Sequence, residues 1–460
     1  MTTLLIWATF TIIGGVNNDS MTCFPQALLS HAIITALYQI MTFENTLKFA
    51  RSLDEKDTLK DFRQQFYIPQ VDGKDAIYLC GNSLGLQPKT VEDHLKVELE
   101  DWRNLGVEGH LHGKNPWLYY HHFFSESIGR LVGADKSEVV VMNQLTVNLN
   151  LMLISFYRPE GKRNKILVEA NEFPSDYYAI EQQIRLHGLN PEDCIVEVMP
   201  RAGEVTLRTE DIISKIEEHK DELALVMLSV VNYYTGQLFE IPKIAAVCAT
   251  HNITIGLDLA HAIGNVELQL HNWGIDFATW CSYKYLNSGP GGVSGVFVNE
   301  RHANNSSLPR LAGWWGNDEK TRFKMQKNFV PQTGAAGWQI SNAPILSMAA
   351  HKASLEIFDK ATLPALRKKS ELLTGYLYWL LTDGGQRTKD NGEYKIITPA
   401  VKEHRGCQLS IQTKANGKQL FEKISKAGVI ADWREPDVIR VAPVPLYNTF
   451  EDVWRFASLI

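Results

Sequence analysis

Two charged side chains, Asp258 and Lys284, each follow an apolar run and lie 26 positions apart in the chain. Asp258 closes the run 253–257 and opens the string Asp258-Leu-Ala-His261, whereas Lys284 ends the run that begins at Phe277. Removing an unpaired charge from water is costly, so each group needs a partner. An acid that pairs with a pyridinium nitrogen and a lysine that forms a Schiff base are what pyridoxal phosphate requires of a protein. The pair therefore predicts a pyridoxal-phosphate enzyme.

Other polar side chains also follow predicted strands. Thr146 stands where a strand pattern passes into a helical one, so it could bind an anion or simply cap a helix. The string Phe173-Pro-Ser-Asp176 offers a ring for a flat heterocycle and polar groups for its substituents, with helix capping as the alternative. Ser229 ends another strand pattern. Ligands of open α/β sheets bind beyond the carboxyl ends of the strands, so we expect these residues to converge.

Four more residues extend the candidate site, and three of them, His261, Arg440 and Trp314, have a structural alternative. His261 could stabilise a cofactor oxygen or phosphate, or pack as a buried histidine. Arg440 lies in an apolar strand pattern, where its guanidinium needs a carboxylate from a substrate or from the protein itself. Trp314 and Asn342 lie in a region of mixed polarity that suggests an interface or a ligand-binding face, although core packing is the alternative for the tryptophan.

The elements that must position these residues alternate regularly along the chain. Strand patterns cover residues 139–142, 165–168, 194–198, 223–228, 253–257, 277–281 and 293–298, with helical patterns over 175–186, 209–219 and 241–251. This alternation predicts an α/β fold with a mostly parallel sheet and helices on both faces. Beyond about residue 340, a long helical stretch over 344–381 leads to strand patterns at 409–411 and 438–441. We therefore expect an N-terminal extension (1–43), a helical arm (44–80), a large cofactor-binding α/β domain (81–340) and a small C-terminal α+β domain (341–460).

Composition excludes several classes of protein. The chain has 460 residues, 45% hydrophobic and 21% charged, which is typical of a globular protein. A net charge of −6 without a dense basic stripe argues against a nucleic-acid partner. Six scattered cysteines without a CxxC pair favour the cytoplasm, and no span or metal site is expected. The extension has an apolar run at 3–13 without the basic flank of a secretory signal, so we expect poor order there or a true start at Met41.

Over residues 59–460 the chain resembles the kynureninase family, of the type I pyridoxal-phosphate-dependent transferase-like fold. The resemblance is carried by the strings 81–89, Phe173-Pro-Ser-Asp176, Asp258-Leu-Ala-His261, 282–287, 337–344 and 432–445. It implies a seven-stranded sheet, a homodimer, and hydrolysis of L-kynurenine to anthranilate and L-alanine, in tryptophan catabolism and de novo NAD biosynthesis. The 3-hydroxy substrate would give 3-hydroxyanthranilate. A cysteine desulfurase, a small-substrate aminotransferase and an inactive scaffold on the same fold are the alternatives.

The resemblance also implies a role for each matched residue. Lys284 would bind pyridoxal phosphate covalently, Asp258 would pair with its ring nitrogen, and Tyr283 would carry a proton. The cofactor would be lined by Leu145, Thr146, Phe173, Pro174, Ser175, Asp176, Ser229, His261 and Tyr283. Trp314 and Asn342 would complete the site by reaching a neighbouring subunit's cofactor. Arg440 would bind the substrate α-carboxylate, and Asn342 and His110, with His112 as its competitor, would contact the aromatic ring.

Overall fold

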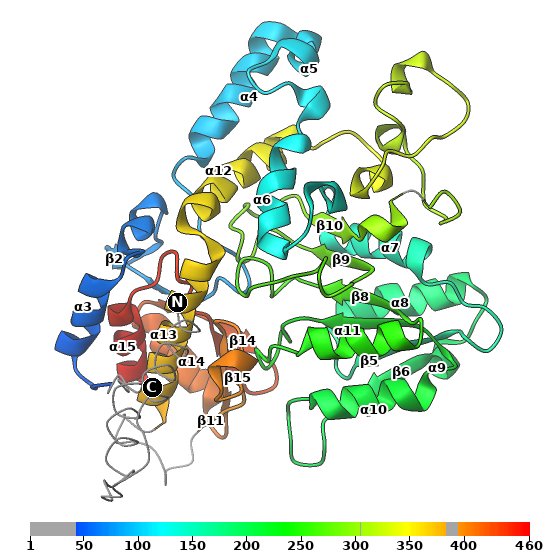
Figure 1. Cartoon of the computed structure of the whole chain (residues 1–460). Helices are drawn as coiled ribbons and strands as arrows, with labels where there is room; N and C mark the ends of the chain where they lie inside the picture. Colours follow the sequence, from blue (N-terminus) through cyan, green and yellow to red (C-terminus); the bar gives the residue numbers. More distant parts are fainter. Residues whose placement is uncertain (1–42, 304, 383–393) are drawn as a thin grey trace, which may run out of the picture. The chain divides into compact units, whose positions relative to one another are not determined.

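The computed structural model describes residues 43–303, 305–382 and 394–460, and Glu44–Ile460 form one compact unit (Figure 1). Its α-helices are α3 (Leu47–Lys56), α4 (Val91–Leu105), α5 (Gly109–His112), α6 (His122–Val132), α7 (Leu145–Phe156), α8 (Pro174–Leu186), α9 (Pro191–Cys194), α10 (Thr209–His219), α11 (Ile241–Thr250), α12 (Ile345–Ala361), α13 (Leu363–Leu381), α14 (Gly417–Lys426) and α15 (Phe450–Leu459). The expectations for residues 1–42 lie outside the described residues.

The strands are β1 (Gln70–Val71), β2 (Lys74–Asp75), β3 (Ile77–Tyr78), β4 (Val139–Val141), β5 (Lys165–Glu169), β6 (Ile195–Val198), β7 (Leu223–Ser229), β8 (Thr254–Asp258), β9 (Phe277–Trp280), β10 (Gly295–Val298), β11 (Tyr394–Ile396), β12 (Leu409–Thr413), β13 (Val429–Ile430), β14 (Asp432–Arg434) and β15 (Val438–Val441). All seven strands predicted between residues 139 and 298 are present, with bounds that differ by one or two residues.

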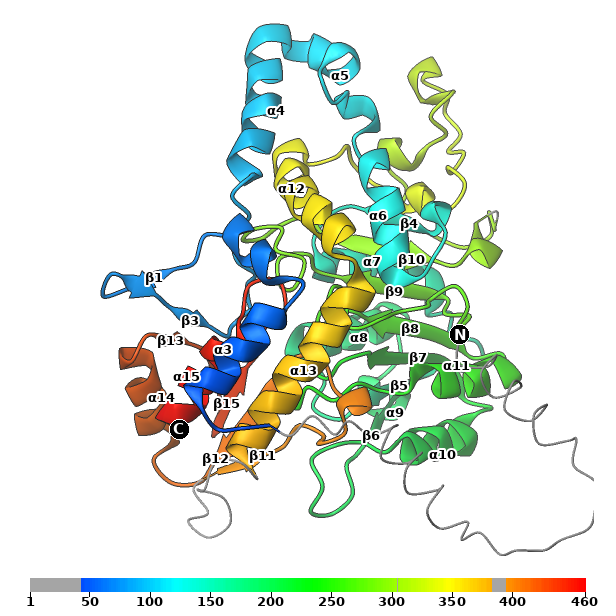
Figure 2. The ribbon, with the colours of Figure 1, turned by 60° about the vertical axis from the view of Figure 1, so that its left-hand side comes forward.

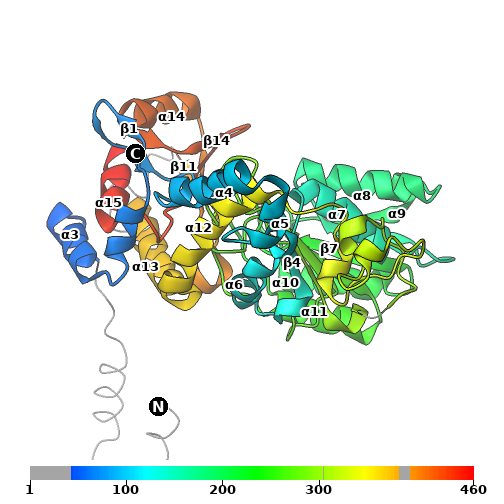
Figure 3. The same cartoon turned by 90° about the horizontal axis from the view of Figure 1, so that it is seen from above.

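Those seven strands form one sheet in the order β4-β10-β9-β8-β7-β5-β6. Strands β6, β5, β7, β8 and β9 run parallel to one another, and every residue of β7 is buried. Burial on both sides explains why the strands read as unbroken apolar runs in the sequence. Helices α7 and α8 cover one face and α10 and α11 the other (Figure 3). The predicted fold class is confirmed.

Strand β10 is the antiparallel member of the sheet. It pairs antiparallel with both β9 and β4, so it runs back from the edge at which its parallel neighbours end. The chain reverses between β9 and β10 through a turn in which Gly289 and Gly291 have φ angles of 92° and 62°. Such left-handed backbone suits glycine, which lacks a Cβ. The sheet is thus mostly parallel, as predicted.

The C-terminal strands build a second, antiparallel sheet in the order β11-β12-β15-β14, which confirms the strands predicted at 409–411 and 438–441. The segment after residue 44 packs against this part of the chain. Strand β3 pairs with β13, and α3 lies beside α15 and α13 (Figure 2). The Asp54 carboxylate accepts hydrogen bonds from the first two N–H groups of α15. The domain boundaries proposed near residues 80 and 340 stay a prediction.

The helical stretch predicted over 344–381 is two helices, α12 and α13, that meet at Thr362. Thr362 has φ 62°, and Pro364 follows in the first turn of α13. A positive φ ends α12, and proline is accepted only at a helix start, so one straight helix cannot form. The string Thr362-Leu-Pro364 was the signal for this break. Within the described residues, no helix combines the length and the apolar composition needed to cross a membrane.

Candidate active site

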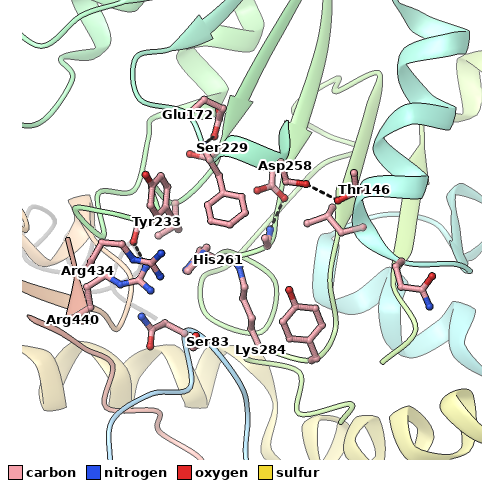
Figure 4. A pocket seen from close by; sticks show the side chains of 18 residues that line it. Ser83, Thr146, Glu172, Ser229, Tyr233, Asp258, His261, Lys284, Arg434 and Arg440 are labelled. Carbon is pink, nitrogen blue, oxygen red and sulfur yellow. Dashed lines mark hydrogen bonds between the residues drawn. The ribbon is translucent and has the colours of Figure 1, made fainter. Parts of the chain in front are cut away.

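A cavity of about 280 Å³ lies at the edge where the parallel strands end (Figure 4). Ser229 closes β7, Asp258 closes β8 in direct register with it, and Lys284 follows β9 by four residues. The cavity is lined by Asn82, Ser83, Gln144, Leu145, Thr146, Glu172, Phe173, Ser175, Ser229, Val231, Tyr233, Asp258, Ala260, His261, Tyr283, Lys284, Arg434 and Arg440. The convergence expected from the sequence therefore occurs for most of the predicted residues.

Asp258 is 7% exposed, and its Oδ1 accepts a 2.8 Å hydrogen bond from the backbone N–H of Ala260. Burial raises the pKa of Asp258, whereas the positive charge of Lys284 and the Ala260 bond act in the opposite direction. A buried carboxylate with so few donors gains from a cation placed beside it. The protonated ring nitrogen of a pyridine cofactor meets this requirement.

Lys284 and His261 lie together in the cavity, with 2.9 Å between Nζ and Nε2. Burial, and next the charge of Lys284, hold the pKa of His261 well below its usual value. A low pKa favours the neutral imidazole, whose Nε2 can accept a hydrogen bond from Lys284 Nζ. His261 Nδ1 is buried without a hydrogen-bond partner among the described residues, so a polar group of a ligand could use it. The packing alternative for His261 does not account for these positions.

Three further acids surround Asp258. Glu169 accepts hydrogen bonds from Ser229 Oγ at 2.7 Å and from the Asn232 amide at 3.2 Å. Burial raises the pKa of Glu169 to about 8, and it raises those of Glu172 and Asp176 well above their usual values. Asp176 does not line the cavity, but the Asp258 charge adds to the rise in its pKa. Burial therefore favours the protonated form of all these acids, and a nearby cation such as Lys284 acts against this effect at Asp258 and Asp176.

The end of the cavity formed by Thr146 and Ser175 is suited to a phosphate. Thr146 Oγ1 and Ser175 Oγ lie 2.7 Å apart at the first turns of α7 and α8. The residues before these helices, Gln144 and Phe173, make no side-chain capping bond, so N–H groups at both helix starts are available to an anion. Neither Thr146 nor Ser175 occupies the capping position that was the alternative for it. Hydroxyls and free N–H groups of this kind are suited to bind a phosphate.

The string 81–89 packs against the segment that contains Tyr283 and Lys284. The Gly85 N–H donates to Tyr283 O at 2.8 Å, and a Cβ on Gly85 would lie 2.3 Å from the carbonyl oxygen of Lys284. Only glycine permits this approach. The same turn brings Asn82 and Ser83 into the cavity, positions to which the sequence gave no role.

Arg440 lines the cavity and is only 2% exposed. Its Nη2 and Nε donate to the Asp432 carboxylate at 2.7 and 3.1 Å, and Nη1 donates to Tyr233 O at 2.7 Å. The internal ion pair considered as an alternative is thus present. It does not remove Arg440 from the site, since the guanidinium still faces the cavity (Figure 4).

Sequence reasoning did not find several lining residues, namely Asn82, Ser83, Gln144, Glu172, Val231, Tyr233, Ala260 and Arg434. Most of them are neighbours in sequence of residues that were predicted. Glu172 precedes Phe173, and Arg434 lies within the string 432–445 that carried the family resemblance. Tyr233 follows Ser229 by four residues in a polar segment, so its position beyond β7 was the available signal.

His110, Trp314 and Asn342 lie in a second cavity, of about 830 Å³, which shares no lining residue with the first. His110 Nδ1 is 3.0 Å from Val107 O, and Trp314 Nε1 donates to Arg322 O at 3.1 Å. Trp314 is 49% exposed, so the core alternative for it is excluded. Within one chain, His110, predicted to contact the substrate, and Trp314 and Asn342, predicted to complete the cofactor site, are therefore in a different cavity from Lys284. Pro174, at the start of α8, also does not line the first cavity.

Comparison with known proteins identifies the family. The family model "Kynureninase C-terminal domain" matches residues 366–460, and the model "O-phosphoseryl-tRNA(Sec) selenium transferase, SepSecS" matches 122–272. A kynureninase of Flavobacterium johnsoniae is 50% identical over 420 residues, covering 91% of this chain and 98% of the relative. One of Myxococcus xanthus is 52% identical over 419 residues, covering 91% and 97%. The chain belongs to the kynureninase family. The resemblance found in the sequence is confirmed.

Solved structures agree on the fold. A C-DES variant with glycine linked covalently to its pyridoxal phosphate cofactor superposes with a TM-score of 0.70 at 15% identity, covering 86% of this chain and 98% of that one. The cysteine desulfurase CsdA of Escherichia coli gives a TM-score of 0.68 at 15% identity, covering 87% and 97%. These likenesses show the type I fold alone. At about 50% identity, the kynureninases take precedence over the desulfurases, so the desulfurase alternative is not favoured.

Proposed function

We propose that this cavity binds pyridoxal 5'-phosphate and that the enzyme hydrolyses L-kynurenine to anthranilate and L-alanine. The same reaction would convert 3-hydroxy-L-kynurenine to 3-hydroxyanthranilate and L-alanine. The observation that carries the proposal is the arrangement of Lys284 and Asp258 in one cavity of a chain about half identical to kynureninases. The enzyme is a hydrolase of carbon–carbon bonds, and its cofactor is pyridoxal phosphate. The roles of individual residues below are our inference.

The residues fit the cofactor at each of its parts. Thr146, Ser175 and the first turn of α7 would hold the phosphate. Leu145 would line its edge, and Phe173, whose ring centroid lies 5.9 Å from Lys284 Nζ, would pack on the ring. Asp258 would hold a proton on the ring nitrogen, and Asp176 would assist through its contact with Asp258. Ser229 and His261 would bond the remaining polar substituents.

The chain's own residues would then move protons. Bound pyridoxal phosphate supplies an electron-withdrawing ring next to the substrate amine. Lys284 would bind the cofactor, yield to the substrate amine, and take the proton from Cα. Tyr283 lines the same cavity, and burial raises its pKa, so its hydroxyl keeps its proton. Tyr283 would therefore act as the general acid when water adds to the ketone carbon and the bond between that carbon and the β-carbon breaks. Arg440 would bind the α-carboxylate and thereby fix the substrate's position.

We also propose a homodimer in which His110, Trp314 and Asn342 of one chain complete the other chain's site. Support comes from their separation from Lys284 and from the exposed apolar side chains around them, Trp314, Leu111 and Phe323. An exposed apolar cluster of this kind favours a protein interface. A C2 dimer would place each cluster against its partner symmetrically.

We place the enzyme in the cytoplasm because its described cysteines form no disulfide. Unpaired cysteines suit a reducing compartment, and those described are Cys80, Cys194, Cys248, Cys281 and Cys407. Cys194, Cys248, Cys281 and Cys407 are buried, so these four do not offer the mobile thiol that a desulfurase needs.

The direct test uses the cofactor-loaded enzyme. Fluorescent anthranilate should appear when L-kynurenine is added, and L-alanine should form in equal amount. Borohydride reduction followed by peptide mass analysis should place the cofactor on Lys284, and the Lys284→Ala enzyme should lose both the label and turnover. The exposed Lys418 provides a matched control, since Lys418→Ala should retain both. Absence of product from both substrates would refute the assignment.

A further inference from the structure

The start of α6 brings two histidines beside a glutamate from a distant part of the chain. His121 precedes the helix and His122 is its first residue, whereas Glu319 lies 197 positions after His122. His122 Nε2 is 3.0 Å from Glu319 Oε1, and His121 Nε2 is 3.5 Å from the same oxygen. One side-chain atom of each residue lies within 4.8 Å of the other two. No metal site was expected from the sequence, so the fold alone creates this cluster.

His121 is buried without using its ring nitrogens. It is 2% exposed, and neither Nδ1 nor Nε2 has a hydrogen-bond partner among the described residues. The great majority of buried polar atoms are paired, so an imidazole with two unpaired nitrogens needs an explanation. A cation bound at the Glu319 carboxylate would use one of these nitrogens as a ligand.

The spacing of the cluster suits a tetrahedral metal ion. Bonds of about 2.0–2.1 Å at tetrahedral angles place neighbouring ligand atoms about 3.3 Å apart. The distances from the two histidines to Glu319 Oε1, 3.0 and 3.5 Å, lie on either side of this value. Two imidazoles and one carboxylate are a ligand set of zinc sites that keep a fourth position for water. Glu319 also lines the second cavity, from which water could reach that position.

The charges around Glu319 favour a transition metal over a hard cation. Arg322 Nη2 lies 3.8 Å from Glu319 Oε1 and donates to Trp315 O at 2.9 Å. This guanidinium offsets part of the Glu319 charge, whereas Mg²⁺ and Ca²⁺ bind mainly through oxygen ligands. Imidazole nitrogens are ligands that suit zinc and its neighbours in the transition series. The donor set therefore favours Zn²⁺.

A second cluster of the same kind is already engaged in holding the backbone. Asp135, Glu138 and His271 also lie within reach of one another. Glu138 Oε2 accepts a 2.9 Å hydrogen bond from the Asp135 N–H, and Oε1 accepts one of 2.8 Å from the Glu300 N–H. A metal ion would have to compete with both donors. The cluster at the start of α6 is therefore the better candidate.

We propose that His121, His122 and Glu319 bind one Zn²⁺ ion per chain. The ion would join the start of α6 to the segment 313–325, which carries Trp314 on one side of the second cavity. The site goes beyond the proposed function, since it shares no residue with the cavity that contains Lys284. Zinc here links two distant segments of the chain.

Binding is measured on tag-free, cofactor-loaded enzyme after dialysis against a chelator. Titration calorimetry with ZnCl₂ should show one site per chain, whereas MgCl₂ should give no heat of binding. Zn²⁺ at about a hundredfold its dissociation constant should raise Tm by about 3 °C. His122→Ala and Glu319→Gln should each weaken zinc binding at least about tenfold and remove the rise in Tm. These two side chains are partly exposed, so both variants should fold even if His121→Ala does not.

His219→Ala is the matched control. His219 also lies beside two glutamates, 3.5 Å from Glu218 and 2.8 Å from Glu222, but has no second histidine in its cluster. Its replacement should leave the zinc affinity unchanged. Absence of zinc binding to the wild type would overturn the proposal, and so would an equal zinc affinity of the wild type and the variants of His122 and Glu319.

Discussion

Nζ of Lys284 lies 2.9 Å from Nε2 of His261, whose pKa is held well below its usual value by burial and by the charge of Lys284. The Asp258 carboxylate is buried in the same cavity; burial raises its pKa, and the charge of Lys284 acts in the opposite direction. If Lys284 binds the cofactor covalently as proposed, Asp258 would depend on the cofactor ring for a cation.

Asp258→Asn should therefore cost at least about a hundredfold in kcat, because losing one partner of a buried ion pair costs about 3–5 kcal/mol. The amide is close in shape to the carboxylate, so folding should be retained. Steady-state anthranilate release measures the effect, and far-ultraviolet circular dichroism checks the fold. A variant within threefold of wild type would contradict the pairing of Asp258 with the ring nitrogen.

Glu169 should make the cofactor-free protein less stable as pH rises from about 4.5 to about 8. Its folded pKa, about 8, exceeds the ordinary value of 4.5, so the folded state holds a proton that the unfolded chain has released. The stabilisation is complete at the acid end of this window and is lost at the basic end. Glu169→Gln should remove that slope and raise Tm by several degrees at pH about 9. Thermal melts of the apo-protein across pH check this, with exposed Glu55→Gln as the unaffected control.

Mixed dimers should recover activity from two inactive chains. If Asn342 serves the partner's Lys284, a hybrid of Lys284→Ala and Asn342→Ala chains has one site with both defects and one intact site. Random reassociation should then restore about a quarter of wild-type activity, since about half the dimers are hybrids with one working site each. Activity is measured after the two chains are mixed, dissociated and reassembled. Continued inactivity would mean that each chain's Asn342 acts with its own lysine.

His110 and His112 should behave differently although they are two residues apart. His110 lines the second cavity, whereas His112 does not and pairs with Glu108 on the surface at 3.5 Å. His110→Phe should raise the KM for kynurenine about tenfold, equivalent to about 1.4 kcal/mol of binding. His112→Phe should leave KM unchanged. The reverse result would assign the ring contact to His112.

The sequence predicted the parts of the site that follow buried strands. Ser229, Asp258 and Lys284 were identifiable because an apolar run ends just before each of them, and a parallel sheet aligns such ends. Arg434 and Tyr233 escaped notice because they lie in polar surroundings, where a site residue looks like any exposed side chain. The order of the strands and the antiparallel direction of β10 depend on pairing between distant segments, which periodicity does not record. The break at Thr362 was missed because the residues on both sides favour a helix. The positive φ of Thr362 is visible only in the structure.

The direction of β10 has a consequence for how the enzyme responds to dilution. This strand carries the chain away from the edge where Lys284 lies, and Trp314 and Asn342 follow it into the second cavity. A catalytic unit shared between two such chains is lost when the chains separate. Specific activity should then fall as the enzyme is diluted below its dissociation constant, and return when it is concentrated. The enzyme concentration would thus determine both how many active sites are present and what fraction of them is complete.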